Sequence, residues 1–417
     1  MAISINPFNP RDPSPAPEFV GRAEELKLFQ YSLDMTCNHS PMSMAIIGGR
    51  GIGKTSLLVK FNDIAKSRGS LVIRVSLIEP EIKDEFSISQ YIFYNIRQEA
   101  YAQLKIRNTS EEVLNHLWDI KLTLGPRKTS LTQQNEEDTM ERVSIIQPRF
   151  RDVLSDLWSH LKSHFTSIVI LLDEAEALDK VPNSFLFLRE IFSRLGEEKY
   201  PIMVVLCGKL DMLDTMGGEF SPLLRFFHPR RLQNFSLVEC EELVKRRLEA
   251  INLRIEDGLV KTIYEQTEGH PYVFISAMHL IIKNINDEEN IISRKHYEAI
   301  MPILIEYIIS GFFETLYSNL TPRAKILIGK MAILEGELFN FKDIVQKAAE
   351  DSNKVSPYIS EMVRKGCIER IERGKYKFFH LLFRAYVKKR YEMPNHPVIN
   401  FIKPNSQESH TTLLGWM

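Results

Sequence analysis

A glycine-rich run at residues 48–55 has the composition and spacing of a phosphate-binding loop. The run satisfies the pattern G-x-x-x-x-G-K-[ST]. Its residues are Gly48, Gly49, Arg50, Gly51, Ile52, Gly53, Lys54 and Thr55. Glycines let backbone N–H groups converge on phosphate oxygens, Lys54 reaches the β- and γ-phosphates, and the Thr55 hydroxyl is placed to hold Mg²⁺. Ser56 follows at the start of an expected helix, whose N-terminus favours anions. We therefore predict that residues 48–56 bind ATP or ADP with Mg²⁺.

An acidic pair supplies the second half of this expected site. Asp173 and Glu174 follow the continuous apolar run at 167–172, which is typical of a strand buried on both faces. A carboxylate at the carboxyl end of a parallel strand lies in the ligand crevice. We expect Asp173 to hold Mg²⁺ beside Thr55, and Glu174 to act as the general base that orients the attacking water. Glu176 is expected at the surface.

The elements that must position these residues alternate between strands and helices. Apolar runs predict strands at 44–47, 70–77, 167–172 and 201–207, with helices between them. The predicted fold class is an α/β P-loop nucleotidase core with a parallel sheet, followed by a helical lid and a winged helix. The predicted organisation is an extended arm (1–18), an ATPase core (19–235) with a helical insertion (85–165), a lid (236–320), a winged helix (321–391) and a flexible tail (392–417).

Composition restricts the class of protein. The chain has 417 residues, of which 44% are hydrophobic and 26% charged, with a formal net charge of −1. These values are ordinary for a globular protein. A net charge this close to zero gives no overall electrostatic attraction to nucleic acid. We expect no membrane-spanning run and no signal peptide. The four scattered cysteines indicate reduced thiols rather than a zinc site, so we expect a cytoplasmic protein.

The motifs together resemble the AAA+/STAND group of P-loop ATPases. The segment FVGRAEEL at 19–26, the phosphate loop and the LLDEA run at 171–175 are similar to the archaeal-type ATPases and, more distantly, to archaeal origin-initiator ATPases. This resemblance implies that Val20 and Gly21 contact the adenine. It also implies a polar sensor at the end of the 203–208 strand, where this chain has Cys207 followed by Lys209.

Two further family positions concern catalysis and the lid. The segment 222–227 resembles the one that carries an arginine finger, which makes Arg225 the candidate, with Arg230 and Arg231 as rivals. The alternative is that Arg225 complements a helix dipole. Gly269, His270 and Pro271 resemble the G-x-P motif of STAND switches, whose proline packs on the nucleotide, and Tyr272 stands where many relatives have a sensor arginine. This departure favours a slow switch over a fast motor.

Residues 321–391 have the pattern of a winged helix that binds DNA. Three predicted helices (322–334, 341–349 and 356–365) precede a hairpin around Gly374. Residues 320–391 contain 16 Lys or Arg and 8 Asp or Glu, a local net charge of +8 that suits phosphate contacts. The candidate DNA contacts are Lys354, Arg364, Lys365, Arg370, Arg373, Lys375 and Lys377.

The same module admits two other interpretations. Phe379-His380-Leu381 resembles the Met-His-Asp segment of STAND winged helices, in which the histidine touches the ADP phosphate, although Leu381 replaces the aspartate. On that hypothesis the module locks an inactive state. It is also possible on the sequence alone that His380 is a core residue and the charges form a solvated face.

We expect an ATP-binding, slowly hydrolysing switch whose nucleotide state controls a DNA-bound or partner-bound assembly. The alternative is an autoinhibited, ADP-locked signalling or defence switch that acts on a protein partner without DNA. Self-association or a protein partner is expected in both cases, and a membrane partner in neither.

Overall fold

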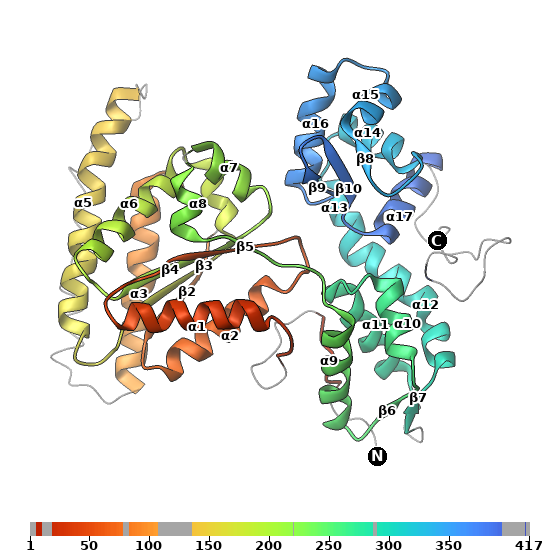
Figure 1. The fold of residues 1–417 in the computed structure, drawn as a ribbon, viewed down its shortest axis with the longest axis horizontal. Coiled ribbons are helices and arrows are strands. Elements are labelled where there is room, and N and C mark those ends of the chain that lie inside the picture. The colour runs from red at the N-terminus through yellow and green to blue at the C-terminus, as the bar shows by residue number, and fades with distance from the viewer. Residues whose placement is uncertain are drawn as a thin grey trace. The chain divides into compact units, whose positions relative to one another are not determined.

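The computed structural model describes residues 6–10, 19–77, 83–106, 136–219, 221–286, 290–393 and 413. It forms two compact units (Figure 1). The N-terminal core unit comprises Arg22–Gly48 and Lys54–Leu232. The C-terminal unit comprises Gln233–Met417 together with Met1–Gly21 and Gly49–Gly53. Part of the phosphate loop is therefore grouped with segments distant in sequence.

The core unit is built on a five-stranded parallel sheet of order β2-β3-β4-β1-β5. Its strands are β1 (Met44–Ile47), β2 (Leu71–Ser76), β3 (Ile168–Asp173), β4 (Ile202–Gly208) and β5 (Arg230–Arg231). Every residue of β1, β3 and β4 is buried, as their continuous apolar runs predict. The four predicted core strands are present. The short edge strand β5 was not predicted, because it consists of two arginines.

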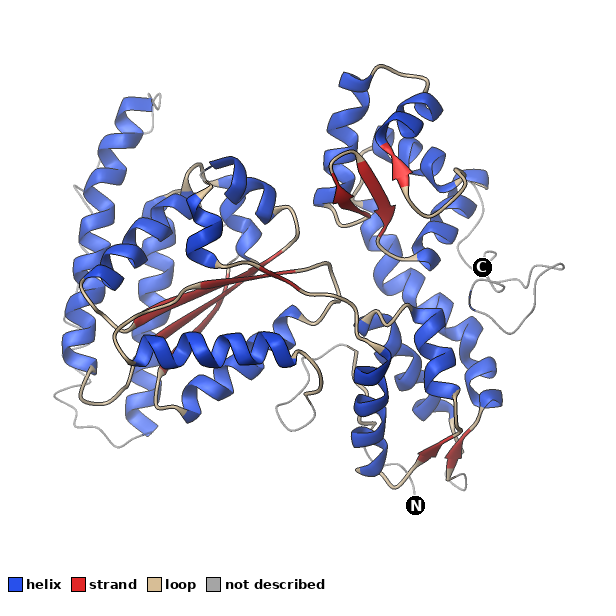
Figure 2. Ribbon diagram, viewed as in Figure 1, coloured by secondary structure: helices blue, strands red, loops and turns tan. Residues whose placement is uncertain are grey.

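Helices cover both faces of this sheet (Figure 2). They are α1 (Ala23–Cys37), α2 (Lys54–Ser67), α3 (Glu85–Ile106), α5 (Glu136–Leu161), η3 (Ala175–Lys180), α6 (Ser184–Glu197), α7 (Met212–Glu219) and α8 (Pro222–Phe227). Ile168, Ile170 and Leu172 pack in one core with residues of α3, α5 and α6. The alternate β3 residues point to the opposite face, which is the period of two that a strand imposes. Part of the predicted helical insertion lies outside the described residues.

The first half of the C-terminal unit is a helical lid. It contains α9 (Leu237–Glu249), α10 (Leu259–Thr267), α11 (Pro271–Asn284), α12 (Arg294–Ile308), η4 (Ile309–Phe313) and α13 (Glu314–Ser318), with a parallel pair β6 (Arg254–Ile255) and β7 (Ile291–Ile292). Ser236 and Glu239 form a capping box that starts α9. The segment η4 is a π-helical turn within one long helix, and such turns are frequent at functional sites.

That long helix corrects one sequence expectation. Within the described residues, Arg294–Ser318 is long and apolar enough to cross a membrane, with a mean hydropathy of 1.5 over its window. We had expected no run of that kind. Half of the window is buried, and Leu304, Ile308 and Phe312 belong to the core of the C-terminal unit. Core helices of globular domains can have the same length and composition, and this helix packs in the core of the C-terminal unit.

The second half of the C-terminal unit has the winged-helix order of elements. These are α14 (Pro322–Ala332), β8 (Phe339–Asn340), α15 (Phe341–Ala348), α16 (Ser352–Arg364), β9 (Ile368–Glu372), β10 (Lys375–Phe378) and α17 (Leu381–Glu392). The strands form a sheet of order β8-β10-β9. Thr321 caps α14 by accepting from the Ala324 amide. Gly374 turns the hairpin at a φ of 80°, a conformation that favours glycine.

The winged helix and the lid share one hydrophobic core through α17. The Phe313 ring lies 5.3 Å from the Phe383 ring, centroid to centroid. Arg390 donates to Glu314 at 2.9 Å. These contacts join α17 to the long lid helix, so we expect the winged helix to move with the lid.

Two terminal segments also pack on the lid. Phe8 is fully buried, its ring lies 5.3 Å below the Arg247 guanidinium, and its carbonyl contacts His279 Nδ1 at 2.5 Å. Leu413 is buried, and its amide donates to Gln266 Oε1 at 2.9 Å. Most of the predicted arm and tail lies outside the described residues.

Candidate nucleotide-binding site

The core unit holds the lysine, hydroxyl and carboxylate of the candidate site beyond the carboxyl ends of β1 and β3, the two strands that flank β4. The Gly48 amide donates to the Gly208 carbonyl at 3.1 Å, which fixes the exit of β1 against β4. Lys54 begins α2, and its Nζ donates to the Gly48 carbonyl at 3.0 Å. The Thr55 hydroxyl donates to Asp173 Oδ2 at 2.9 Å. The structure therefore brings together Thr55 and Asp173, the residues that the sequence predicts to hold a metal.

These residues fit a Mg²⁺–nucleotide complex. A hydroxyl and a buried carboxylate are hard oxygen donors, and Mg²⁺ is usually bound through one or two carboxylates with phosphates and waters completing its shell. No group of three or more His, Cys, Asp or Glu side chains capable of holding a metal occurs among the described residues. A Cβ at Gly49 or Gly53 would meet no atom within 4 Å, so the loop backbone is open to a ligand there.

The candidate general base lies beside a second, buried glutamate. Glu174 has a left-handed backbone, with φ 53°, and its amide donates to Asp173 Oδ1 at 3.0 Å. Burial and the neighbouring Glu176 carboxylate raise the pKa of Glu174 to about 7. The Glu176 side chain is only 11% exposed and pairs with Lys209 Nζ at 2.6 Å. Our expectation that Glu176 lies at the surface was wrong, because Lys209 supplies the cation that makes its burial tolerable.

The two candidate sensor residues at the end of β4 differ in their burial. Cys207 is fully buried within the strand and is level with Ile46 of β1. Burial raises the pKa of the Cys207 thiol, so it stays protonated. Lys209 lies one residue beyond the strand and is partly exposed, and its contacts with Glu176 raise its pKa although its burial opposes this. A sensor role for either residue stays a prediction.

The other candidate nucleotide contacts belong to the C-terminal unit. Val20 is buried in its core, and Gly21 has φ 79° and approaches the Glu239 side chain of the α9 cap.

The loop residues Gly49–Gly53 group with the same unit. The amide of Tyr272 donates to the Gly51 carbonyl at 3.2 Å. A Cβ at Gly51 would lie 2.9 Å from Tyr272 Cβ and 3.0 Å from His270 Cε1. Pro271 is buried at the first position of α11.

His270 is the centre of a ring cluster that reaches from the loop to the winged helix. Its ring lies 5.8 Å from Phe312, 6.0 Å from Phe379 and 5.9 Å from His380. Arg50 lies over the Phe312 ring at 5.8 Å, and Tyr272 meets that ring edge-on at 5.2 Å. We call His270, Tyr272, Phe312, Phe379 and His380 the loop-to-wing cluster. Burial and the neighbouring His380 lower the pKa of His270 to about 3, so it is neutral at neutral pH.

His380 is bonded within the C-terminal unit. Its Nδ1 accepts from the Leu382 amide at 3.1 Å and caps α17, while Nε2 lies 3.0 Å from the Thr267 carbonyl. These partners require Nε2 to carry the proton and Nδ1 to be bare, which is a neutral ring. Burial lowers the pKa of His380, in agreement with that assignment. A contact between His380 and a nucleotide phosphate stays a prediction.

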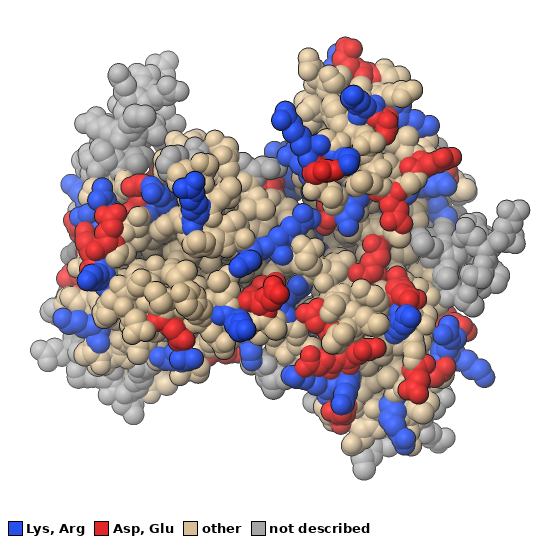
Figure 3. Space-filling model, in the orientation of Figure 1, with Lys and Arg blue, Asp and Glu red and all other residues tan. Residues whose placement is uncertain are grey.

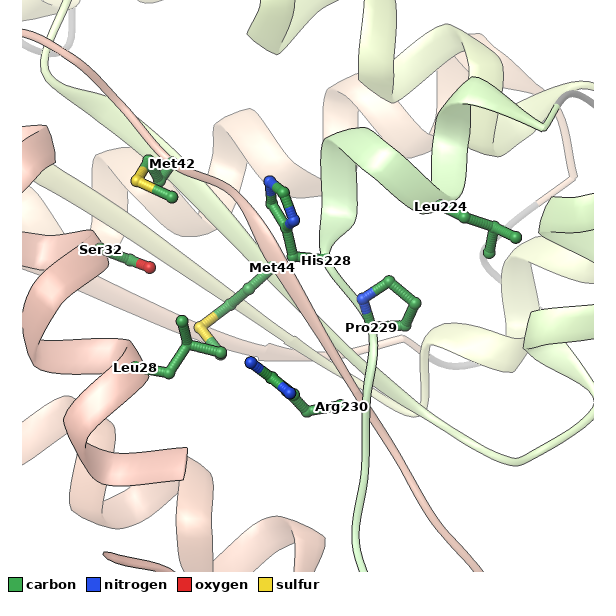
Figure 4. Close-up of a pocket in the computed structure, with 8 residues that line it drawn as sticks. All are labelled: Leu28, Ser32, Met42, Met44, Leu224, His228, Pro229 and Arg230. Carbon is green, nitrogen blue, oxygen red and sulfur yellow. The ribbon is translucent and has the colours of Figure 1, made fainter. Parts of the chain in front are cut away.

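One arginine-finger candidate, Arg230, lines a cavity of about 340 Å³ in the core unit (Figure 4). It is lined by Leu28, Ser32, Met42, Met44, Leu224, His228, Pro229 and Arg230. Met42 and Met44 lie before and at the start of β1, whereas the phosphate loop follows the other end of that strand. The cavity is therefore distinct from the phosphate loop. Arg225 is exposed in the last turn of α8, so both its interpretations remain open.

The candidate DNA contacts lie on α16 and the wing. Lys354, Arg364, Lys365, Arg370 and Arg373 are exposed. Lys375 pairs with Glu372, and Lys377 Nζ lies 3.8 Å from Glu369. Figure 3 shows acidic and basic side chains interspersed over the visible surface. The wing therefore presents less free positive charge than its sequence suggests.

Comparison with known proteins supports the fold and the resemblance. Residues 18–205 match the family described as AAA ATPase domain, and residues 310–387 match a domain of unknown function. A Walker-type ATPase of Pyrococcus abyssi has a similar structure, with a TM-score of 0.55 at 16% identity, covering 91% of this chain and 99% of that one. The ORC1 protein of Aeropyrum pernix, solved in complex with DNA, matches with a TM-score of 0.44 at 16% identity over 90% of this chain and 93% of that one.

One curated relative spans nearly the whole chain. It is a Methanocaldococcus jannaschii protein described as an uncharacterized HTH-type transcriptional regulator. It is 23% identical over 400 residues, which are 91% of this chain and 91% of that protein. The match to the AAA ATPase domain confirms the predicted resemblance to AAA ATPases. The structural likeness to the Walker-type ATPase confirms the α/β P-loop fold class.

Proposed function

We propose that the AAA ATPase domain of this chain binds ATP with Mg²⁺, hydrolyses it slowly and sets the state of the winged helix. The loop amides and Lys54 would hold the phosphates, while Thr55 and Asp173 would hold the metal. Mg²⁺, when bound, neutralises charge on the phosphate oxygens. Glu174 would orient the attacking water, and Arg225 would supply positive charge from a second copy. Val20, Gly21 and Pro271 would contact the nucleoside.

The observation that carries the switch proposal is the loop-to-wing cluster. Arg50 lies in the phosphate loop, and its side chain covers Phe312. Phe312 in turn lies 5.5 Å from Phe379, the residue before the cap of α17. A nucleotide that draws the loop backbone and Arg50 toward its phosphates would alter these contacts. Because packed rings have few alternative arrangements, such a change would reach the winged helix.

Nucleotide turnover tests the enzymatic part of this proposal. Wild type, Lys54→Ala and Glu174→Gln are compared in Mg²⁺ and in EDTA, with the exposed Lys66→Ala of α2 as the matched control. We expect slow, Mg²⁺-dependent turnover in wild type and Lys66→Ala. Lys54→Ala should lose nucleotide affinity, whereas Glu174→Gln should bind ATP without cleaving it. Equal turnover in all four proteins, or no binding of ATP to wild type, would exclude this function.

We propose duplex DNA as the partner of the winged helix. The exposed basic residues of α16 and the wing favour it, as does the description of the curated relative as an HTH-type regulator. Arg364→Ala with Lys365→Ala should weaken binding at low salt, whereas the lid double variant Lys245→Ala with Lys283→Ala should not. Affinity should fall as salt rises. Binding that is absent at low salt would exclude DNA as the partner.

A second candidate is an ADP-locked switch that acts on a protein partner in the cytoplasm. It is favoured by the ion pairs within the wing, which reduce the positive charge available to DNA. Under this alternative, purified protein should retain ADP, turn over little ATP and ignore DNA. Sizing in ATP and in ADP would then report self-association or release of a protein partner.

A further inference from the structure

The cavity of the core unit lies beside a part of β1 that lacks a neighbouring strand on one side. β5 pairs only with Ile46 and Ile47, the last two residues of β1. In the described part of the sheet, the edge of β1 at Met44 is therefore not covered by β5. Leu28 and Ser32 of α1 line the cavity, and they share one face of that helix because they are four residues apart. We call this space the β1 cavity.

The opposite wall of the β1 cavity is formed by the turn that ends α8. The helix ends at Phe227, and His228 follows in the left-handed conformation, with φ 42° and ψ 61°. This turn and Pro229 lead the chain back toward β1, so that Arg230 begins β5 beside the cavity. Leu224, one helical turn before His228, completes this wall. All the lining residues belong to the core unit, so the cavity is formed within that unit alone.

Ser32 presents a buried hydroxyl to this cavity. The residue is 1% exposed, and its hydroxyl makes no hydrogen bond with the residues that the structure describes. Figure 4 shows this hydroxyl pointing away from α1 and toward Met44. Buried polar side chains in native proteins nearly always have a hydrogen-bond partner. The cavity therefore offers a polar ligand atom one buried hydrogen-bonding group.

Arg230 supplies a permanent positive charge to the same cavity. Its guanidinium makes no ion pair or hydrogen bond within the described part of the chain, and no lining residue is acidic. In Figure 4 its side chain extends toward Leu28 and Met44. A guanidinium binds a carboxylate through two parallel hydrogen bonds, which are stronger than bonds between neutral groups. The charge of the lining therefore favours a carboxylate.

The rest of the lining is mainly apolar and adaptable. Leu28, Met42, Met44, Leu224 and Pro229 offer hydrocarbon and thioether surface. Methionine side chains are flexible and fit ligands of irregular shape. Apolar walls with a few converging polar groups are typical of small-molecule sites, whose volumes are about 300–1,000 Å³. A volume of about 340 Å³ restricts the ligand to a small molecule.

We propose that the β1 cavity binds a small amphipathic monocarboxylate. Its carboxylate pairs with Arg230 and contacts the Ser32 hydroxyl, while its hydrocarbon body packs on Met42, Met44 and Leu224. Arg230 is thereby a ligand contact within its own chain rather than an arginine finger. The phosphate loop follows the other end of β1, so this inference does not depend on the proposed ATPase function.

Titration calorimetry of the full chain without nucleotide tests the ligand chemistry. The three probes are octanoate, octanamide, which lacks the charge, and acetate, which lacks the hydrocarbon body. We expect saturable binding of one octanoate per chain, with octanamide and acetate at least about tenfold weaker. Octanoate that does not bind saturably to wild type, or octanamide that binds equally well, would overturn the proposal.

Two variants separate the charge from the space. Arg230→Gln should raise the Kd for octanoate by about tenfold to a hundredfold, because it removes the charge-assisted hydrogen bonds. Leu224→Phe should also weaken binding, because it fills the cavity while it leaves both polar groups in place. Arg194→Gln, an exposed arginine of α6 outside the lining, is the control and should bind octanoate as wild type does. Unchanged affinity in both cavity variants would place the octanoate elsewhere and overturn the proposal.

Methionine methyl resonances report the position of octanoate in the unaltered protein. The chain has 14 methionines, and the spectra of Met42→Leu and Met44→Leu assign the two signals of the cavity. We expect octanoate to shift these two signals with the same midpoint as the calorimetric titration. Shifts of other methionine signals, with these two unchanged, would contradict the assignment. Since this measurement uses wild type without ATP, it stands whether or not the variants fold and whether or not the protein cleaves ATP.

Discussion

The backbone amide of Tyr272 donates a hydrogen bond to the carbonyl oxygen of Gly51, 3.2 Å away. Tyr272 is the second residue of α11, whose first-turn amides have no partner within the helix. Pro271 before it has no N–H to offer. The lid thus satisfies one of its unpaired donors with a carbonyl of the phosphate loop.

Gly51→Ala should weaken nucleotide binding through this contact. The residue has φ 75°, and a Cβ there would lie 2.9 Å from Tyr272 Cβ. A left-handed alanine costs about 1–2 kcal/mol, so we expect the Kd for ATP to rise by about tenfold. Gly218→Ala on α7, where a Cβ meets nothing within 4 Å, is the control. Wild-type affinity of Gly51→Ala in titration calorimetry would show that the loop does not need this geometry.

Acid should destabilise the C-terminal unit through His270. Burial and, next, His380 lower the pKa of His270 to about 3 in the folded state. In the unfolded chain this pKa is near ~6.5, so the unfolded state takes up a proton first as the pH falls. The stability is fully present above about pH 6.5 and is lost as the pH falls toward the folded-state pKa. We expect about 2 kcal/mol of loss between pH 7 and pH 5 from this one residue.

The comparison of His270→Gln with wild type measures that contribution. Urea unfolding at pH 7 and pH 5 should show a smaller loss in His270→Gln, whereas His160→Gln on α5 should keep the wild-type pH dependence. An identical pH dependence in wild type and His270→Gln would mean that His270 is not held neutral.

Phe8→Ala should destabilise the C-terminal unit although Phe8 lies close to the N-terminus. The ring is fully buried and packs under Arg247, whose Nη1 donates to the Pro7 carbonyl at 3.1 Å. Removal of a buried phenylalanine ring costs about 3–5 kcal/mol. Phe8→Leu should lose less, because it refills part of the site. A Phe8→Ala variant with the wild-type urea midpoint would indicate that this segment does not stabilise the lid.

Sequence reasoning succeeded where the determinants are local. The spacing of Gly48 and Lys54 defines the loop, continuous apolar runs define the buried strands, and Thr321 with Pro322 marks the start of α14. Each of these signals acts over a few residues, so one sequence contains it in full.

It failed where residues distant in sequence decide the outcome. Glu176 has no local feature that distinguishes it from a surface glutamate, because its burial depends on Lys209, 33 positions later. Phe8 lies in a segment rich in proline and asparagine, and its burial depends on α9 and α11. An acidic residue three positions after Asp173, together with a lysine directly after the next strand, is a pattern that could have predicted the burial of Glu176.

Amide hydrogen exchange of residues 379–392 in ATP and in ADP tests the central claim most directly. Glu174→Gln is used so that ATP persists, and Lys54→Ala serves as the control without nucleotide. We predict that exchange around the N-terminus of α17 differs between ATP and ADP. Phe312→Leu should abolish the difference without changing nucleotide affinity. Identical exchange in the two nucleotides, with both shown to be bound, would contradict a switch that reaches the winged helix.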